Sequence, residues 1–588
     1  MFRQSMHFLS KKIRFRLTPE TLPAWLYIGL PLIGLYDLTQ ETYLVEIAGI
    51  VLTAAAILRL YRRAPQTLRW TTCDVLLTAY FLLATGNGGF TAPIRIQDNG
   101  LLCGMMYLYA RLLASSSLSM PSVALFLAGG LLQVCIAVLQ QAGIVASLHN
   151  DFTVTGSFGN PGPLACYLCT SFLIGLTGFY ALRSQHAYRP KYLFFVPIAV
   201  ILLYGLYLAD SRTAWLASGC GWMSIPVLRQ RTASARRKGL VICSIAALSG
   251  TLALYTYRSI SADARILIWK AGSSLFIHHP LTGTGTNGFA SNYMPAQGTY
   301  LENAGPAERL LASDNQLAYN EWLRTGCEQG IIGLLLLGIP TCLLLYKASA
   351  TFRLSNNPCF PPLIGWLVFS CFSYPTAEPA LSILFPLFLG LTGNATIGPA
   401  RNAAFSTTRR ILYPCLITAA VFFAYNCTCR YRANQHLASL FFEEETDEEY
   451  MPPENKSFIF RDTQLLRLYT TVWMINEYYP QALQGMQTLQ TLSPSVQLLL
   501  DEGLCLEATG RQEQAVAKYR TAIRWVPGLL TPRFRLFMAY KQQGDTLTAL
   551  KLAQDVIQSP VKQEDDRTFQ MREIARSFIH SQQTQTTR

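Results

Sequence analysis

Hydrophobic residues divide the chain into a long apolar part and a polar tail. From Leu22 to about Asn426 they gather in runs separated by short polar connections, whereas the residues that follow mix polar and apolar side chains. A run of about 20 apolar residues crosses a bilayer as a helix. The pattern therefore predicts an all-α fold, a polytopic transmembrane helical bundle of about 12–13 spans with a soluble tail. The candidate spans are residues 22–36, 43–60, 72–86, 100–114, 122–142, 163–182, 191–208, 213–228, 239–257, 328–346, 361–374, 380–393 and 411–427.

The composition agrees with a membrane protein and argues against a large soluble enzyme. Of the 588 residues, 51% are hydrophobic and 14% are charged, whereas about a quarter of the residues of a soluble protein are charged. The net charge of +14 comes mostly from Lys and Arg in short clusters between apolar runs. We interpret these clusters as topology signals and expect no nucleic-acid partner. Most of the 15 cysteines lie in or beside apolar runs, so we expect small core residues and no metal site.

The distribution of basic residues predicts the topology. A cluster of them lies shortly before the first apolar run: Lys11, Lys12, Arg14 and Arg16. By the positive-inside rule this segment lies in the cytoplasm, and most other basic clusters then fall on the same side. A large loop, residues 258–327, and the tail are consequently expected outside the cytoplasm. We divide the chain into a membrane domain (1–430), an acidic linker (431–460) and a C-terminal domain (461–588).

The tail contains an internal repeat. Gly510, Ala515 and Tyr519 recur as Gly544, Ala549 and Ala553, at the period of 34 residues that is typical of tetratricopeptide helix pairs. An earlier, weaker unit extends from about 462 to Pro494. Stacked units of this kind form a concave surface that binds a partner chain. We therefore predict tetratricopeptide-like helical repeats that bind an envelope protein.

Two polar stretches at the outer ends of apolar runs are candidates for chemistry. Asp210, Ser211 and Arg212 lie between two adjacent spans, where a charge is costly unless it is used or paired. An interfacial arginine paired with Asp210 is the structural alternative. The stretch from Arg265 to Trp269 predicts a partly amphipathic helix along the membrane surface. It is followed by a glycine-rich turn with Gly283 and Gly285.

Two further stretches are expected on the same side of the membrane. One is a turn that leads into a span and ends with Asn160 and Pro161, and the other contains Asn320, Glu321 and Glu328. Two arginines among polar groups at this face suit a phosphate-bearing lipid headgroup, because guanidinium binds phosphate bidentately. Each stretch also has a purely structural interpretation, such as a turn, a helix cap or an interfacial helix start.

These stretches, in this order, resemble the O-antigen ligase family of membrane glycosyltransferases, which includes O-antigen polymerases and protein O-oligosaccharyltransferases. The resemblance covers roughly residues 150–395 and rests on the Gly-Ser-Phe-Gly-Asn-Pro turn, Ser211-Arg212, the Arg265 to Trp269 helix and the Asn320-Glu321-Trp322-Leu323 block. The short turn Phe372-Ser373-Tyr374-Pro375 also resembles family members. The resemblance implies a GT-C-like fold in the bacterial inner membrane, with a periplasmic site and a periplasmic C-terminal domain.

The resemblance also implies a reaction. The donor is a glycan on undecaprenyl diphosphate, and the acceptor is a hydroxyl of lipid A-core. No nucleotide sugar, cofactor or obligatory metal is expected. Arg212 and Arg265 match the family's arginines and are expected to bind the diphosphate. The other implied substrate-binding residues are Asn160, Asp210, Ser211, Trp269, Gly283, Gly285, Asn320 and Glu328.

One position departs from the family pattern. Tyr319 stands where family members commonly have a histidine before the asparagine, and tyrosine is a poor base at neutral pH. We include Tyr319 among the candidate catalytic residues. Glu321 is the first candidate to replace the histidine, followed by Asp314 and Glu328.

Three alternatives for the function stay open. A polymerase transfers the glycan to a growing chain, and a protein O-oligosaccharyltransferase transfers it to a Ser or Thr hydroxyl. An envelope scaffold or a polysaccharide transporter represents another class of function. The apolar pattern shows no inverted repeat, which argues against the transporter.

Overall fold

The structure is a computed structural model, and every regular element in the part that it describes is a helix. It describes residues 18–33, 44–62, 71–87, 92–113, 118–149, 151–183, 192–230, 232–257, 259–350, 358–396, 405–442, 456–562 and 564–586. The expected all-α fold is confirmed for these residues.

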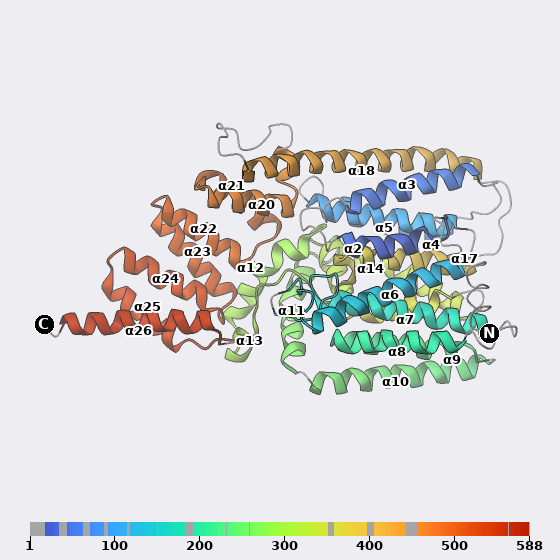
Figure 1. Cartoon of the computed structure of the whole chain (residues 1–588), viewed down its shortest axis with the longest axis horizontal. Coiled ribbons are helices and arrows are strands. Elements are labelled where there is room, and N and C mark those ends of the chain that lie inside the picture. The colour runs from blue at the N-terminus through green and yellow to red at the C-terminus, as the bar shows by residue number, and fades with distance from the viewer. Residues whose placement is uncertain are drawn as a thin grey trace.

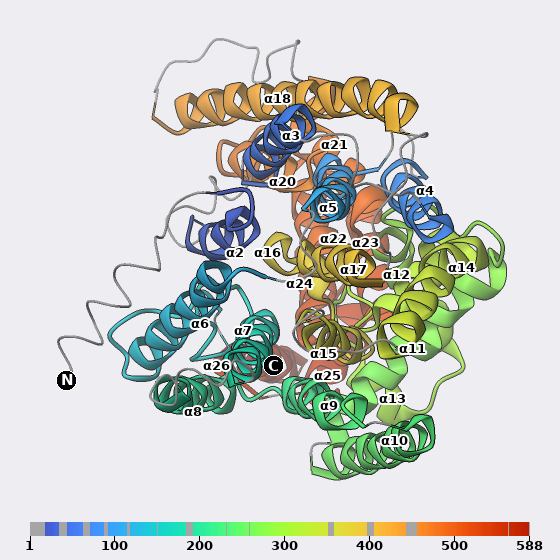
Figure 2. The ribbon, with the colours of Figure 1, turned by 90° about the vertical axis from the view of Figure 1, so that its right-hand side faces the viewer.

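The thirteen predicted spans coincide one by one with helices that form an elongated bundle (Figure 1). Figure 2, turned by 90° from that view, shows α18 and α10 at opposite edges of the bundle. The helices are α2 (Leu22–Ile33), α3 (Leu44–Arg62), α4 (Thr72–Gly86), α5 (Ile94–Leu112), α6 (Met120–Gln141), α7 (Pro161–Arg183), α8 (Tyr192–Leu208), α9 (Arg212–Leu228), α10 (Ala233–Tyr257), α14 (Glu321–Ala350), α15 (Phe360–Ser370), α17 (Leu384–Thr396) and α18 (Phe405–Phe442).

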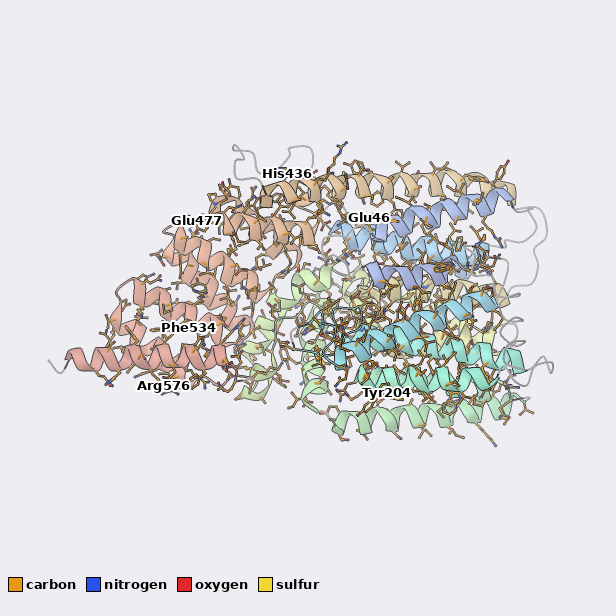
Figure 3. The ribbon with its side chains drawn as sticks, in the orientation of Figure 1. Glu46, Tyr204, His436, Glu477, Phe534 and Arg576 are labelled. Atoms are coloured by element: carbon orange, nitrogen blue, oxygen red, sulfur yellow. The ribbon has the colours of Figure 1, made fainter. Side chains whose placement is uncertain are left out.

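The apolar surface of the bundle identifies a membrane protein. Four of the described helices are both long and apolar enough to cross a membrane, within α6, α7, α14 and α18, and several shorter apolar helices pack beside them. Large hydrophobic side chains point outward from α8 and α10, including Val200, Tyr204 and Ile245 (Figure 3, Tyr204). Many large hydrophobic side chains exposed on neighbouring helices are unfavourable in water and favourable in lipid.

Several helix boundaries differ from the prediction. Residues 431–442 continue α18, so the expected linker 431–460 is wrong in this part, and Lys456–Ile459 form the short helix α19. The acidic run 443–449 lies outside the described residues. The predicted span ends at residue 427 because polar residues follow it. The helix continues because Asn426 and Arg430 are paired with buried carboxylates. Helix α14 is interrupted at Gly330, whose φ of 64° is left-handed.

The loop between α10 and α14 folds into three helices at the end of the bundle that adjoins the tail. They are α11 (Ser259–His278), α12 (Gly288–Glu302) and α13 (Pro306–Leu311). Helix α11 contains the predicted surface helix and runs across the direction of the bundle helices (Figure 1). This orientation is the one that a helix along a membrane surface requires.

The tail consists of antiparallel helix pairs. The helices are α20 (Thr463–Ile475), α21 (Tyr479–Leu492), α22 (Val496–Ala508), α23 (Gln512–Trp525), α24 (Leu530–Gln542), α25 (Thr546–Gln558) and α26 (Asp566–Thr586). Gly510 and Gly544 both adopt left-handed φ at the turn inside a pair, and Ala515 and Ala549 are both fully buried. The repeat read from the sequence is therefore a structural repeat, whereas the assignment to the tetratricopeptide family stays a prediction.

A buried ion cluster joins the bundle to the tail. The guanidinium of Arg430 on α18 is fully buried and contacts Glu46 of α3 at 2.7 Å and Asp98 of α5 at 3.6 Å. It also pairs with Asp462, whose carboxylate caps the first turn of α20. Asn426 donates to Asp98 at 2.8 Å. Figure 3 shows Glu46 at the end of α3 that is nearer the tail.

We predict that Arg430→Met lowers the free energy of unfolding by about 3–5 kcal/mol, because it leaves three buried carboxylates without their cation. Thermal unfolding of the full-length protein in detergent measures the change. The matched control is Arg576→Met, which removes an exposed arginine of α26 (Figure 3). Equal midpoints for the two variants would contradict a structural role of the cluster.

Candidate active site

The turn between α8 and α9 presents Arg212 at the end of the bundle. Ser211 is the N-cap of α9 and Arg212 is its first residue. Asp210, directly before them, has a φ of 47°. A left-handed conformation of a residue other than glycine costs about 1–3 kcal/mol and persists only where the surrounding structure imposes it. The backbone is therefore strained next to the arginine that the sequence singled out.

Arg212 and Arg265 line the same cavity. Its volume is about 320 Å³, and its walls come from α9, α10, α11 and the turn after α15. Apart from the two arginines the lining is mostly apolar, with Leu216, Leu252 and Ile266 among its residues. The expected convergence of two arginines at one face is thus seen in the structure, and the cavity between them is built mainly of hydrocarbon.

The environment of Arg265 is cationic and aromatic. Burial lowers the pKa of its guanidinium, the charge of Arg212 acts in the same direction, and Tyr319 opposes the shift. An arginine remains charged at neutral pH under these conditions. Its guanidinium carbon lies 5.4 Å from the centre of the Tyr319 ring, a cation–π distance. Two like charges beside one cavity are favourable when an anion lies between them.

Tyr319 connects this cavity to the other predicted stretches. Its φ is 49°, so it is a second strained residue, and its ring meets that of Tyr374 edge to face at 5.0 Å between centroids. A Cβ at Gly162 would lie 3.7 Å from the Tyr374 hydroxyl and 3.4 Å from Oδ1 of Asn160. A chain of contacts through Tyr319 and Tyr374 therefore connects Arg212 and Arg265 to the turn that carries Asn160.

Two predicted binding residues act as helix caps. Oδ1 of Asn160 accepts from the N–H of Gly162 at 3.0 Å, at the start of α7. Oδ1 of Asn320 accepts from Trp322 and Leu323, both at 3.0 Å, at the start of α14. These bonds satisfy backbone donors that a helix start leaves free. Substrate binding by either residue stays a prediction.

Glu321 and Glu328 line a second cavity, of about 90 Å³, inside the bundle. Glu321 is buried, accepts from the N–H and hydroxyl of Thr376, and pairs with Arg324 at 3.0 Å. Neither carboxylate lines the cavity of the two arginines. A role of Glu321 as general base stays a prediction, and its observed contacts hold the turn after Tyr374 in place.

The backbone around Gly283 and Gly285 packs directly against the backbone at the kink of α14. The N–H of Gly285 donates to the carbonyl of Glu328 at 2.9 Å, and a Cβ at Gly283 would lie 2.3 Å from the backbone of Glu328. A Cβ at Gly330 would lie 2.2 Å from the carbonyl oxygen of Leu281. The two glycines permit a close approach of two chain segments, which is the structural interpretation of this motif.

A comparison with protein families identifies the segment that carries these residues. Residues 197–338 match the O-antigen ligase family. The chain contains an O-antigen ligase domain. No curated protein matches the chain. The family match supports a membrane enzyme of the O-antigen ligase and polymerase type, a type of glycosyltransferase.

The O-antigen ligase domain holds only part of this chain of contacts. Arg212, Arg265 and Tyr319 lie inside the matched segment, whereas Asn160 and Tyr374 come from outside it. Trp269 lines the arginine cavity and donates through Nε1 to the carbonyl of Ala318 at 3.0 Å.

Sequence reasoning gave no role to Tyr374 or Phe372. Both belong to the short turn Phe372-Ser373-Tyr374-Pro375, in which the Phe372 ring contacts that of Trp269 and the Tyr374 ring contacts that of Tyr319. The sequence indicated a role for these two residues only through their position, as aromatic residues in a turn next to a short apolar run.

We predict that Tyr319→Phe retains most of the glycosyl transfer and that Tyr319→Ala loses it. Burial raises the pKa of the Tyr319 hydroxyl, with Arg265 opposing, so the phenol stays protonated and its ring makes the contacts. Transfer rates of the purified variants measure this difference. A Phe variant as inactive as the Ala variant would instead assign the function to the hydroxyl.

Proposed function

We propose that the protein transfers a glycan from undecaprenyl diphosphate to a hydroxyl of lipid A-core at the periplasmic face of the bacterial inner membrane. The observation that supports this most is the placement of Arg212 and Arg265 on one otherwise apolar cavity. The cavity thus has a cationic part and an apolar part. A polyprenyl diphosphate matches both, since its headgroup carries two phosphates and its tail is hydrocarbon.

The two parts of the donor fit the two parts of the cavity. Side chains of α10, among them Leu248 and Leu252, are exposed and line the cavity, so a prenyl chain can enter from the lipid side. Guanidinium groups bind phosphate oxygens through paired N–H donors and keep their charge when partly buried. Under this proposal the diphosphate lies between Arg212 and Arg265.

The reaction under this proposal is a displacement at the anomeric carbon of the glycan. The acceptor oxygen forms a bond to that carbon, the bond to the diphosphate oxygen breaks, and the hydroxyl proton passes to solvent. Negative charge grows on the leaving diphosphate, and preorganised cations that face it lower the barrier. Binding both substrates on one surface supplies orientation as well.

The acceptor side of the site is the part from Tyr319 to Asn160. Tyr374 contacts the Tyr319 ring and adjoins the turn before α7, and it does not line the cavity of the two arginines. Under this proposal the acceptor hydroxyl approaches over Tyr319 while the two arginines hold the leaving group.

We predict that Arg212→Ala and Arg265→Ala each lower transfer by about 100-fold or more, the usual loss when one oxyanion-stabilising donor is removed. Lysine variants keep the charge without the bidentate fork and should fall between alanine and wild type. The control is Arg309→Ala, which changes an exposed arginine of the same loop whose side chain bonds to the carbonyls of Leu301 and Glu302.

The readout is made in a strain that lacks the gene and carries one variant at normal expression. Lipopolysaccharide is separated by gel, and glycan that remains on undecaprenyl diphosphate is quantified. Long glycan on the carrier with bare lipid A-core supports a ligase. Single repeat units on the core would indicate a polymerase, and a change confined to glycoproteins would indicate a protein acceptor. Unchanged glycans of all three kinds would contradict the enzyme proposal.

We predict that protease added to intact spheroplasts removes the C-terminal domain. The loop helices α11 to α13 and the tail lie at one end of the bundle (Figure 1), so both face the same side of the membrane. The positive-inside rule assigns that side to the periplasm. An immunoblot against a C-terminal epitope measures the loss, a cytoplasmic protein serves as control, and a protected tail would contradict the topology.

A further inference from the structure

The segment that carries Tyr319 has no regular structure of its own. Residues 312–320, between α13 and α14, form neither helix nor strand. The polar groups of such a backbone need partners elsewhere, and its conformation is only as fixed as those partners make it. The strained Tyr319 lies near its end, so whatever holds this segment also holds the ring against Arg265.

The turn between α21 and α22 of the tail holds the first half of the segment. Nε2 of Gln316 donates to the carbonyls of Ser493 and Pro494 at 3.3 and 3.4 Å. Oδ2 of Asp314 accepts from the N–H groups of Val496 and Gln497 at 2.9 and 3.4 Å.

Asp314 thereby completes the N-terminal cap of a tail helix. Ser495 is the N-cap of α22 and accepts from the third N–H, that of Leu498, at 3.2 Å. The first two N–H groups of α22 would otherwise lack a protein partner. A carboxylate at a helix N-terminus is also favoured by the helix dipole.

A buried amide makes a second connection between the segment and the tail. Gln297 of α12 is 1% exposed, and its Nε2 donates to the carbonyl of Ser313 at 3.1 Å and to that of Trp525 at 2.9 Å. Its amide oxygen accepts from Tyr293 at 2.7 Å. One side chain thus connects the start of the segment to the end of α23.

Helix α11 holds the other end of the segment. The carbonyl of Ala318 accepts from Nε1 of Trp269, which lies on α11 together with Arg265. The segment therefore extends from the tail, at Asp314 and Gln316, to the helix that carries the arginine.

We propose that the tail is a positioning element of the active site, in which the α21–α22 turn holds residues 313–320 through Asp314 and Gln316 and so places Tyr319 against Arg265. Asp314 is a positioning residue in this scheme and does not act on the substrate. The inference rests on the proposed function for its catalytic consequence, although the contacts themselves do not depend on it.

The test compares three variants of the full-length protein in nanodiscs. Asp314→Ala removes the cap, whereas Asp314→Asn retains an oxygen that caps equally well. Asp545→Ala is the matched control, because Asp545 caps α25 by accepting from the N–H of Thr548 at 3.0 Å and, among the described residues, makes no hydrogen bond to residues 313–320. Hydrogen–deuterium exchange is measured at residues 313–320 and 496–498, and transfer is measured with a lipid-linked glycan.

We expect Asp314→Ala to raise amide exchange in both regions and to lower turnover by about fivefold, the factor by which a removed helix cap typically shifts the equilibrium of the structure that it holds. Asp314→Asn should remain within about twofold of wild type in both measurements, and Asp545→Ala should leave residues 313–320 unchanged.

Three results would overturn the inference. If Asp314→Asn is as impaired as Asp314→Ala, the carboxylate itself is required, as for a general base. If Asp545→Ala also raises exchange at 313–320, the effect is a general loosening of the tail. If no Asp314 variant changes that exchange, the segment is held elsewhere. If the variants change amide exchange as expected but the wild-type protein transfers no glycan, the proposed function is wrong and the contact between the tail and residues 313–320 is still supported.

Discussion

The buried cluster around Arg430 is the interaction from which the placement of the tail follows. A guanidinium without solvent contact lies among three equally buried carboxylates, which come from two bundle helices and from the residue before α20. Such charges are tolerable only when their geometry is closely satisfied. α3, α5, α18 and the first tail helix are therefore fixed relative to one another, and Arg461 reinforces the junction by bonding Gln97 at 2.9 Å.

From that junction the tail returns over the end of the bundle. Helix α12 packs against α21 and α23, and the carbonyl of Leu492 accepts from Asn287 at 2.6 Å. The loop helices, the start of α14 and the tail share one hydrophobic core, which includes Phe289, Cys327 and Trp525. The strained backbone at Tyr319 lies within this assembly. Strain of this kind persists where surrounding contacts over-determine it, and here the tail supplies part of those contacts.

The sequence predicted the bundle well because hydropathy is a property of each segment by itself. The sequence-based prediction failed where contacts with residues distant in sequence determine the structure. α18 continues beyond residue 427 because its polar residues are paired in the interior, and glycines 283 and 285 signalled a turn without revealing that Glu328 lies against it. Topology predicted that Arg212 and Arg265 lie on one side of the membrane, but not that they line one cavity. The contacts of Asp314 and Glu321 were not predicted, since neither Val496 nor Thr376 is near them in sequence.

The arrangement also bears on how transfer can proceed when Tyr319 stands at the position where the resembled family commonly has a histidine. Its phenol stays protonated, and the carboxylate of Glu321 already accepts from Thr376 and pairs with Arg324. Under the proposed function the acceptor hydroxyl is therefore activated late, as its bond to the anomeric carbon forms. Most of the barrier then depends on stabilising the departing diphosphate. Two arginines at one apolar cavity suit that task, because low polarity strengthens their attraction for the growing charge.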